Sequence, residues 1–229
     1  IVYELGSVSF VTASFQVDAP YLDYFVIAGP HPKTVLRRYA DLTGYPPVPP
    51  VWSFGVWMSR CMYRNRQEVE EVVDRARADG FPLDVVHLDP LWLRERRAHR
   101  LDACTFTWDE EAFPSPAEFI ASLRERGVRL CLWENPYVWM DTPFFEEGAR
   151  RGYFARLSDG RWATSLENAE AAIVDFTNPE AVAWIQERHR ALLRQGVAAF
   201  KTDYGEGVPE DARFADGRTG REVHNLYPL

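Results

Sequence analysis

Four short apolar segments alternate with amphipathic helices between residues 50 and 229, and this alternation constrains the fold more than any other feature of the chain. The expected strands lie at 53–59, 84–88, 128–133 and 197–200. Helices are expected at 67–79, from the capping-box pattern Ser115-Pro116-Ala117-Glu118 to Gly127, and from Asn178 to Gly196. Strands that alternate with helices predict a parallel sheet, and their apolar character on both faces is typical of strands buried between layers. A barrel and an open doubly wound sheet both satisfy this pattern, although no glycine-rich phosphate loop follows the first strand.

The chain before residue 50 does not show this alternation of strands and helices. Residues 8–11 and 24–27 are rich in β-forming side chains, and the apolar residues of 33–42 follow helical spacing. Four prolines lie between Pro46 and Pro50, where they exclude both a helix interior and a central strand. We therefore expect a stiff linker and a domain boundary at this point.

Composition narrows the classes of partner. The formal net charge of −8 argues against nucleic acid or an anionic membrane, because both need clustered cations. No apolar run is long enough to span a membrane, and no signal peptide is visible. The three cysteines form no metal-binding motif and are odd in number, so a reducing compartment, the cytoplasm, is expected. Because the chain opens at Ile1 and stops abruptly at Leu229, we expect a piece of a longer protein.

Polar residues follow the end of each predicted strand. They are Arg60, Asp89, the pair Glu134-Asn135, and Asp203. In β/α barrels the carboxyl ends of the strands build the active site. Strand ends are also where polar residues must begin in any fold, so the pattern alone leaves both interpretations open.

The run Phe200-Lys201-Thr202-Asp203-Tyr204-Gly205-Glu206 holds the best candidates for chemistry. Lys201 and Asp203 are two residues apart, so on an extended strand their side chains point the same way. A neighbouring cation keeps a carboxylate ionised, and an ionised carboxylate that faces a pocket can attack an anomeric carbon. Glu206 is placed to tune that carboxylate. A structural ion pair between Lys201 and Asp203 explains the same spacing.

Two more strand ends carry candidates. Asp89 precedes a proline and is either a turn former or a carboxylate that binds sugar hydroxyls or completes a catalytic pair. His87 is expected to pack rather than to act as a base. Trp133 is expected either to stack on a sugar ring or to pack, and Glu134 is a third candidate carboxylate. Neither metal-ligand spacing nor a Gly-x-Ser-x-Gly elbow occurs.

Several segments together resemble glycoside hydrolase family 31, in its bacterial α-xylosidase-like branch. They occur in the family's order along the chain: Pro50-Val51-Trp52-Ser53-Phe54-Gly55-Val56-Trp57, His87-Leu88-Asp89, Phe106-Thr107-Trp108-Asp109, Trp133-Glu134-Asn135-Pro136-Tyr137, Asp175-Phe176-Thr177-Asn178-Pro179, Phe200 to Glu206, and His224-Asn225. Each segment alone is weakly specific, whereas six or more in order are strongly so.

The resemblance implies a (β/α)8 TIM barrel preceded by a β-sandwich. Residues 1–30 would end the sandwich, 31–50 would form a helix and the proline-rich linker, and 51–229 would form the first half of the barrel. It also implies a retaining α-glycosidase that acts on terminal α-linked xylose or glucose, with an oligosaccharide or small glycoside as its partner and neither metal nor organic cofactor. Self-association into a homo-oligomer is left open.

The resemblance also implies roles for single residues. Asp203 matches the nucleophile that forms a covalent glycosyl-aspartate, and Glu206 is expected, from its position alone, to be a supporting carboxylate. Asp89, Lys201 and Trp133 match residues of the sugar subsite.

The chain departs from the family pattern at three places. Pro90-Leu91 stands where known α-xylosidases carry Cys-Phe, and Met62 stands where a pocket phenylalanine is common. Leu91 and Met62 would both line the sugar pocket and affect its specificity. Glu134 replaces an apolar residue.

The family's general acid would lie beyond Leu229, and four strands cannot close a barrel of eight. We therefore expect this piece alone to be inactive. A non-catalytic carbohydrate-binding relative and an α-galactosidase-like barrel hydrolase are the alternatives.

Overall fold

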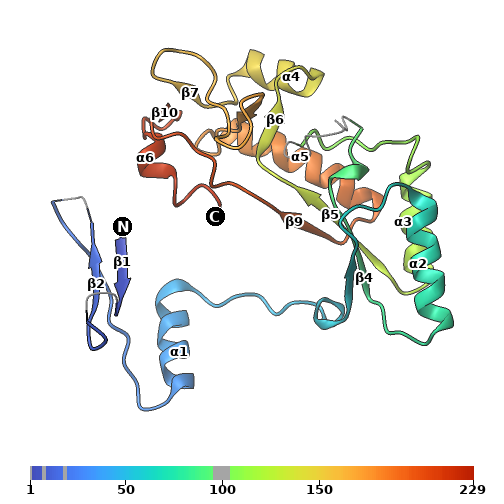
Figure 1. The fold of residues 1–229 in the computed structure, drawn as a ribbon, viewed down its shortest axis with the longest axis horizontal. Coiled ribbons are helices and arrows are strands. Elements are labelled where there is room, and N and C mark those ends of the chain that lie inside the picture. Colours follow the sequence, from blue (N-terminus) through green and yellow to red (C-terminus); the bar gives the residue numbers. More distant parts are fainter. Residues whose placement is uncertain (1, 7–8, 18–19, 95–103) are drawn as a thin grey trace. The chain divides into compact units, whose positions relative to one another are not determined.

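The computed structural model describes residues 2–6, 9–17, 20–94 and 104–229 and divides the chain into two compact units, Ile1–Pro49 and Pro50–Leu229 (Figure 1). In the first unit, β1 (Val2–Leu5) and β2 (Ala13–Gln16) form an antiparallel pair, and α1 (Pro32–Thr43) follows. No side chain of α1 is buried.

The two strands expected in this first unit are misplaced. Residues 9–11 belong to the turn between β1 and β2, and residue 8 lies outside the described residues. Residues 24–27 form no strand, and the side chains of Tyr24, Phe25 and Val26 are all more than 60% exposed. A β-forming composition makes a strand only where another strand is available for pairing, and this stretch has no such partner among the described residues.

The second unit is built on a parallel sheet of four strands in the order β3-β4-β5-β9. The strands are β3 (Trp57–Ser59), β4 (Val85–Leu88), β5 (Arg129–Glu134) and β9 (Ala199–Thr202). Because these strands follow one another across the sheet in chain order, they match a β/α barrel rather than a doubly wound sheet, whose order reverses at a switch point.

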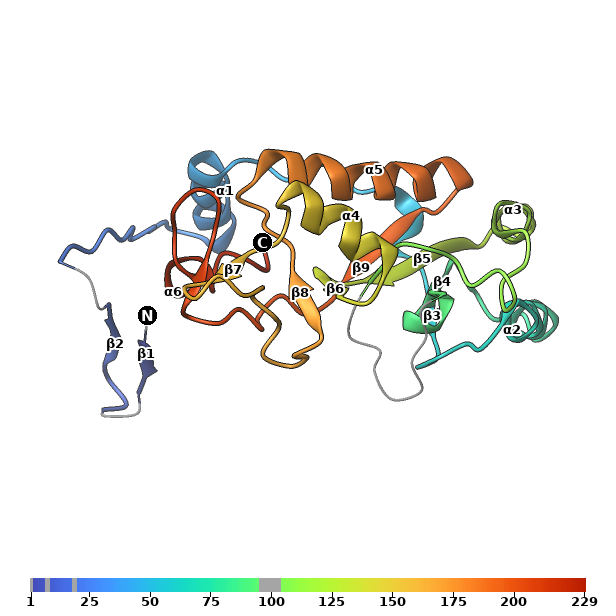
Figure 2. The same cartoon turned by 90° about the horizontal axis from the view of Figure 1, so that it is seen from above.

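Three long helices connect these strands and cover one face of the sheet, as Figures 1 and 2 show. They are α2 (Arg66–Ala78), α3 (Pro116–Glu125) and α5 (Pro179–Gln195). Apolar residues of all three helices share one core with alternate residues of the sheet, such as Val86 and Leu88 of β4 and Leu130 and Leu132 of β5. The remaining residues of each strand, among them Ser59 and His87, therefore point to the other face of the sheet.

A long excursion of residues 135–178 separates β5 from α5. It contains β6 (Tyr137–Trp139), α4 (Pro143–Arg151), β7 (Arg156–Leu157) and β8 (Ala171–Ile173). Strand β6 pairs with β8, and β7 pairs with β10 (Ala212–Arg213), which follows the sheet's last strand. The short helix α6 (Gly220–Val223) and two 3-10 turns, η1 (Val51–Phe54) and η2 (Pro90–Trp92), complete the unit.

The expected helices of this unit begin and end within two residues of those observed. One detail is wrong: Ser115 does not cap α3 with its side chain, because its backbone adopts the left-handed conformation, with φ of 48°. The helix nevertheless begins at Pro116, whose fixed φ suits the first helical position. True side-chain caps occur at Asn65 and Asn178, whose side chains accept hydrogen bonds from the first turns of α2 and α5.

Candidate active site

The carboxyl ends of three neighbouring strands bring four of the predicted site residues together. Asp89 follows β4, Trp133 lies near the end of β5, and Lys201 pairs with Trp133 across the β5–β9 ladder. Asp203 follows β9 directly, and its N–H donates to the carbonyl of Glu134 over 2.8 Å. The sheet therefore places two carboxylates, one cation and one indole N–H at a single edge.

The carboxylate of Asp203 receives three donors and is still open to solvent. Its Oδ2 accepts from the indole Nε1 of Trp133 at 2.8 Å and from Nζ of Lys201 at 3.1 Å, and its Oδ1 accepts from the backbone N–H of Tyr204 at 3.2 Å. Partial burial by itself raises the pKa of Asp203, but the hydrogen bonds from Trp133 and Lys201 outweigh it and bring the pKa below its usual value. Since its side chain is 38% exposed, Asp203 is an ionised carboxylate that a ligand can reach.

Lys201 bridges the two carboxylates. Its Nζ lies 3.1 Å from Oδ2 of Asp203 and 3.7 Å from Oδ1 of Asp89. Partial burial lowers the pKa of Lys201, yet the hydrogen bond and charge of Asp203, together with the charge of Asp89, raise it above its usual value. The group therefore holds one fixed positive charge between two negative ones.

Asp89 is more enclosed, with a side chain only 14% exposed. Its Oδ2 accepts from the hydroxyl of Ser59 at 3.1 Å and lies 3.5 Å from Nδ1 of His87, while Ser59 Oγ and His87 Nδ1 are 3.0 Å apart. Burial lowers the pKa of His87, and the charge of Asp89 only partly opposes this. Ser59 was not singled out from the sequence; the alternation of Ser59, His87 and Asp89 on one face of adjacent strands is the signal that could have revealed it.

The loop after the nucleophile candidate is held by a buried phenol. The backbone N–H groups of Gly205 and Gly207 both donate to the hydroxyl of Tyr137, at 3.1 and 2.8 Å. Tyr204 takes a left-handed backbone conformation, with φ of 62°, and its ring meets the edges of Trp133 and Tyr137. Glu206 is exposed and makes neither a hydrogen bond nor an ion pair with any residue that the structure describes, so its supporting role stays a prediction.

Trp133 and Glu134 point to opposite sides of β5. The ring of Trp133 is 2% exposed and packs in the core, so that its N–H rather than its face is offered to the site. The carboxylate of Glu134 contacts Nε2 of His189 on α5, among the helices. Glu134 thus points away from Trp133 and Lys201 and does not join the group of carboxylates around Lys201.

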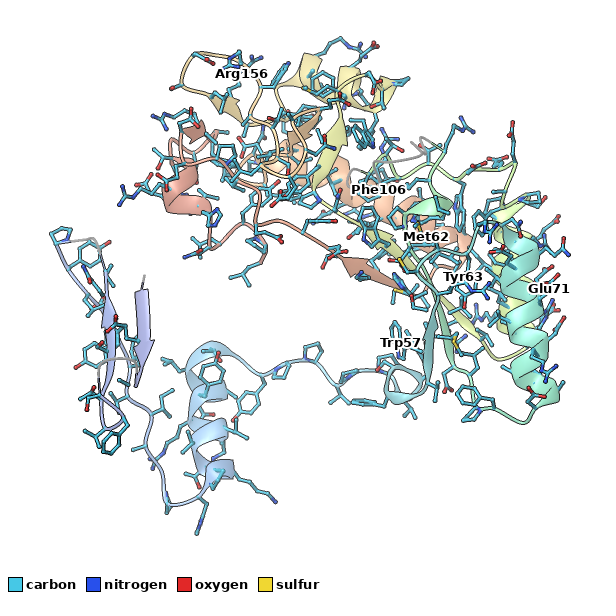
Figure 3. All side chains as sticks on the ribbon, viewed as in Figure 1. Trp57, Met62, Tyr63, Glu71, Phe106 and Arg156 are labelled. Atoms are coloured by element: carbon cyan, nitrogen blue, oxygen red, sulfur yellow. The ribbon has the colours of Figure 1, made fainter. Side chains whose placement is uncertain are left out.

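The other residues singled out from the sequence lie around this group without contacting Asp203. Leu91 is half-buried in η2, and Met62, half-buried with φ of 95°, lies beyond the end of β3 beside Tyr63 (Figure 3). Arg60 turns away to Glu68 and the ring of Tyr63.

A hollow of about 520 Å³ lies beside this edge, between the end of β9, helix α5 and residues 218–229. Asp203 and Tyr204 border it, but Asp89, Lys201 and Trp133 do not. The two side-chain donors to Asp203 and the second carboxylate therefore lie outside this hollow.

Among residues 2–6, 9–17, 20–94 and 104–229, no cluster of His, Cys, Asp or Glu side chains has the arrangement of a metal site. All three cysteines are free thiols. None of the described helices is both long and apolar enough to span a bilayer.

A parallel sheet in chain order, helices on one face and charged residues at the strand ends define part of a β/α barrel with its site at the carboxyl edge. Comparison with known proteins gives the family. Residues 46–229 match the TIM-barrel domain of glycosyl hydrolases family 31. The chain belongs to this family, and the barrel fold expected from the sequence is confirmed.

Individual relatives agree with this membership. The α-xylosidase XylQ of Lactiplantibacillus pentosus is 39% identical over 99% of this chain, and α-glucosidase 2 of Bacillus thermoamyloliquefaciens is 32% identical over 93% of it. A GH31 α-xylosidase from a soil metagenome, solved with xylose, shares the fold with a TM-score of 0.75 at 23% identity, covering 88% of this chain and 29% of that one. The chain spans only 30% and 28% of the two curated relatives.

Proposed function

We propose that the full-length protein is a retaining α-glycosidase that removes terminal α-linked xylose or glucose, with Asp203 as its nucleophile. One observation carries the proposal: the Asp203 carboxylate is held by Trp133 and Lys201 at a barrel strand end and is still 38% exposed. Membership of a glycoside hydrolase family supports it. The two named relatives, an α-xylosidase and an α-glucosidase, support the two candidate sugars.

In the first step, an oxygen of Asp203 attacks the anomeric carbon and the bond from that carbon to the leaving oxygen breaks. The leaving oxygen takes a proton from a carboxylic acid, which we place in the part of the protein beyond Leu229. In the second step, water attacks the same carbon and gives a proton to the carboxylate that the acid has become. The bond between the carbon and Asp203 breaks, and Asp203 leaves as a carboxylate. Asp203 enters and leaves the cycle ionised, which agrees with its lowered pKa.

Lys201 and Asp89 would bind the sugar rather than react with it. Lys201 holds its charge between the two carboxylates, and Asp89 is fixed on one side by Ser59. Hydrogen bonds from such groups orient the sugar so that its anomeric carbon meets Asp203. Leu91 and Met62 would shape the neighbouring wall of the pocket.

The test is Asp203→Ala in the full-length protein, assayed with aryl α-xylosides and α-glucosides. We expect kcat to fall by about 10³-fold or more, because the covalent intermediate can no longer form. Added azide should restore turnover and yield a β-configured glycosyl azide, since the anion then occupies the place of the lost carboxylate.

The matched control is Glu210→Gln, which removes an exposed charge of the same loop and should leave kcat unchanged. Glu206→Gln, assayed beside it, measures the supporting role. An Asp203→Ala variant that keeps most of its activity would refute the assignment. A wild-type protein that binds sugars by calorimetry but hydrolyses none of these glycosides would indicate a non-catalytic relative.

A further inference from the structure

Two residues beside Asp89, the exposed Ser59 and the buried His87, have no part in the proposed reaction, yet both contact Asp89. Ser59 ends β3 and pairs with His87 of β4 in the parallel ladder. Asp89 follows His87 by two residues, so all three side chains lie on the same face. The Ser59 hydroxyl is 3.1 Å from Oδ2 of Asp89 and 3.0 Å from Nδ1 of His87.

These contacts assign the protons. Ser59 has one O–H, and it donates to the carboxylate, which can only accept. The hydroxyl oxygen therefore accepts from His87, which must carry its proton on Nδ1. His87 is 7% exposed, and its Nε2 has no hydrogen-bond partner among the described residues.

This arrangement differentiates the two oxygens of Asp89. Oδ2 faces Ser59 and His87. Oδ1 faces Lys201, whose Nζ is 3.7 Å away, beyond normal hydrogen-bond length. Oδ1 is therefore the oxygen that is left to accept a hydrogen bond from a ligand.

We propose that Ser59 and His87 are positioning residues, which hold Asp89 so that its Oδ1 accepts a hydrogen bond from one hydroxyl of the bound sugar. The proposal rests on the proposed glycosidase function. It makes the Ser59–His87 pair a determinant of which sugar hydroxyl is recognised, although neither residue touches the sugar.

A purely structural pair would give different kinetics. Loss of packing lowers the amount or the stability of folded enzyme and affects every substrate alike. Loss of positioning weakens only the hydrogen bond between Asp89 and one sugar hydroxyl. The kinetic effect of the substitution therefore disappears with a substrate that lacks this hydroxyl. This is a double-mutant cycle in which one change is made in the substrate.

The experiment compares Ser59→Ala with the wild type in the full-length protein, on an aryl α-glycoside and its set of monodeoxy analogues. With the parent substrate we expect kcat/KM to fall about tenfold, the effect of losing a hydrogen bond to a charged group. With the analogue that lacks the hydroxyl bound by Asp89, the two enzymes should have the same kcat/KM. Ser59→Thr keeps the hydroxyl and should restore most of the loss.

A second pair of variants makes the test independent of how Ser59→Ala folds. His87→Asn can place an amide N–H near the position of Nδ1, whereas His87→Leu cannot donate. We expect His87→Leu to behave as Ser59→Ala and His87→Asn to lie close to the wild type. Equal losses on every analogue, or none on any, would overturn the inference, while a wild-type protein without activity would overturn the proposed function instead.

Discussion

The Asp203 carboxylate accepts a hydrogen bond from the indole N–H of Trp133 as well as one from Lys201. Partial burial opposes the charge on this carboxylate, whereas the hydrogen bond from Trp133 and the hydrogen bond and charge of Lys201 favour it. The indole lies behind the carboxylate, in the core, where water does not replace it. Trp133 therefore acts on the Asp203 carboxylate by donating a hydrogen bond, and its ring face stays in the core.

Trp133→Phe is expected to move the acid limb of the pH profile to higher pH. The sign follows from the lowered pKa of Asp203: the group stays ionised below its usual value of 3.8, and attack is lost only when it takes a proton. Without the N–H of Trp133 the pKa rises, so kcat/KM should begin to fall at higher pH and drop about tenfold at its plateau. The measurement is the pH dependence of kcat/KM in the full-length protein.

Trp139→Phe is the control for this substitution. It removes the same atoms from a buried tryptophan in the excursion, away from Asp203. It should lower thermal stability without moving the acid limb. An unshifted limb in Trp133→Phe would contradict the tuning role.

The sequence predicted which residues would meet at the site better than it predicted how they bond. Asp89 and Asp203 follow strands of one sheet and Lys201 lies near the end of β9, so the parallel alternation alone brings them to one edge. The sequence does not decide whether Trp133 stacks on a sugar or packs in the core, because this depends on Trp92 and other distant residues that bury its ring. Ser59 was missed because a hydroxyl with partners on another strand leaves no local signature.

At the scale of elements, a contact between the side chains of Glu134 and His189 joins β5 to α5. The carboxylate of Glu134 contacts His189, whose ring also packs against Phe106 and Phe200. The carbonyl of Glu134 accepts a hydrogen bond from the N–H of Asp203, so this contact helps to fix the strand end next to Asp203. An apolar residue at this position would leave His189 without its carboxylate partner.

His189→Leu should loosen β5 more than Glu134→Leu does. His189→Leu leaves the Glu134 carboxylate, which is 6% exposed, without its partner. Glu134→Leu leaves the His189 imidazole, whose side chain is 25% exposed, without its partner. We expect a loss of about 2 kcal/mol in the opening free energy of β5, less than for a fully buried pair, and partial recovery in the double Leu variant. Hydrogen exchange of β5 peptides, read by mass spectrometry, measures this local free energy.

The same helix offers a matched control. Glu187 pairs with Arg194 at 2.8 Å, but both side chains are more than half exposed, so Glu187→Leu should change exchange in β5 hardly at all. Equal exchange in His189→Leu and the wild type would show that the pair does not fix the strand.

Elements with local signals were predicted well, and those that depend on distant pairing were not. Helices α2, α3 and α5 have apolar periodicity with Gly80, Gly127 and Gly196 close to their ends. The excursion of residues 135–178 escaped prediction because β7 pairs with β10, more than fifty residues later, and each has only two residues. Such short strands carry no periodic pattern that a sequence can reveal.

On the scale of the whole molecule, the described sheet has two open edges. Strand β3 pairs only with β4, and β9 pairs only with β5, within the part of the chain that the structure describes. In the first unit, side chains such as Phe10, Phe25 and Val48 are more than 70% exposed. Unpaired parallel strands and exposed apolar side chains both favour association with further polypeptide.

The 229-residue chain expressed alone should therefore self-associate and hydrolyse no α-glycoside. The site it contains holds the proposed nucleophile and sugar-binding residues, but Asp89, the second carboxylate beside Lys201, is engaged by Ser59 and His87 and is not free to act as the acid. Light scattering after size exclusion should report species larger than a monomer, and an aryl α-xyloside assay should give no turnover above that of Asp203→Ala. The full-length protein is the positive control in both measurements. A monomeric, active 229-residue chain would place the acid within these residues and would require a different catalytic pair.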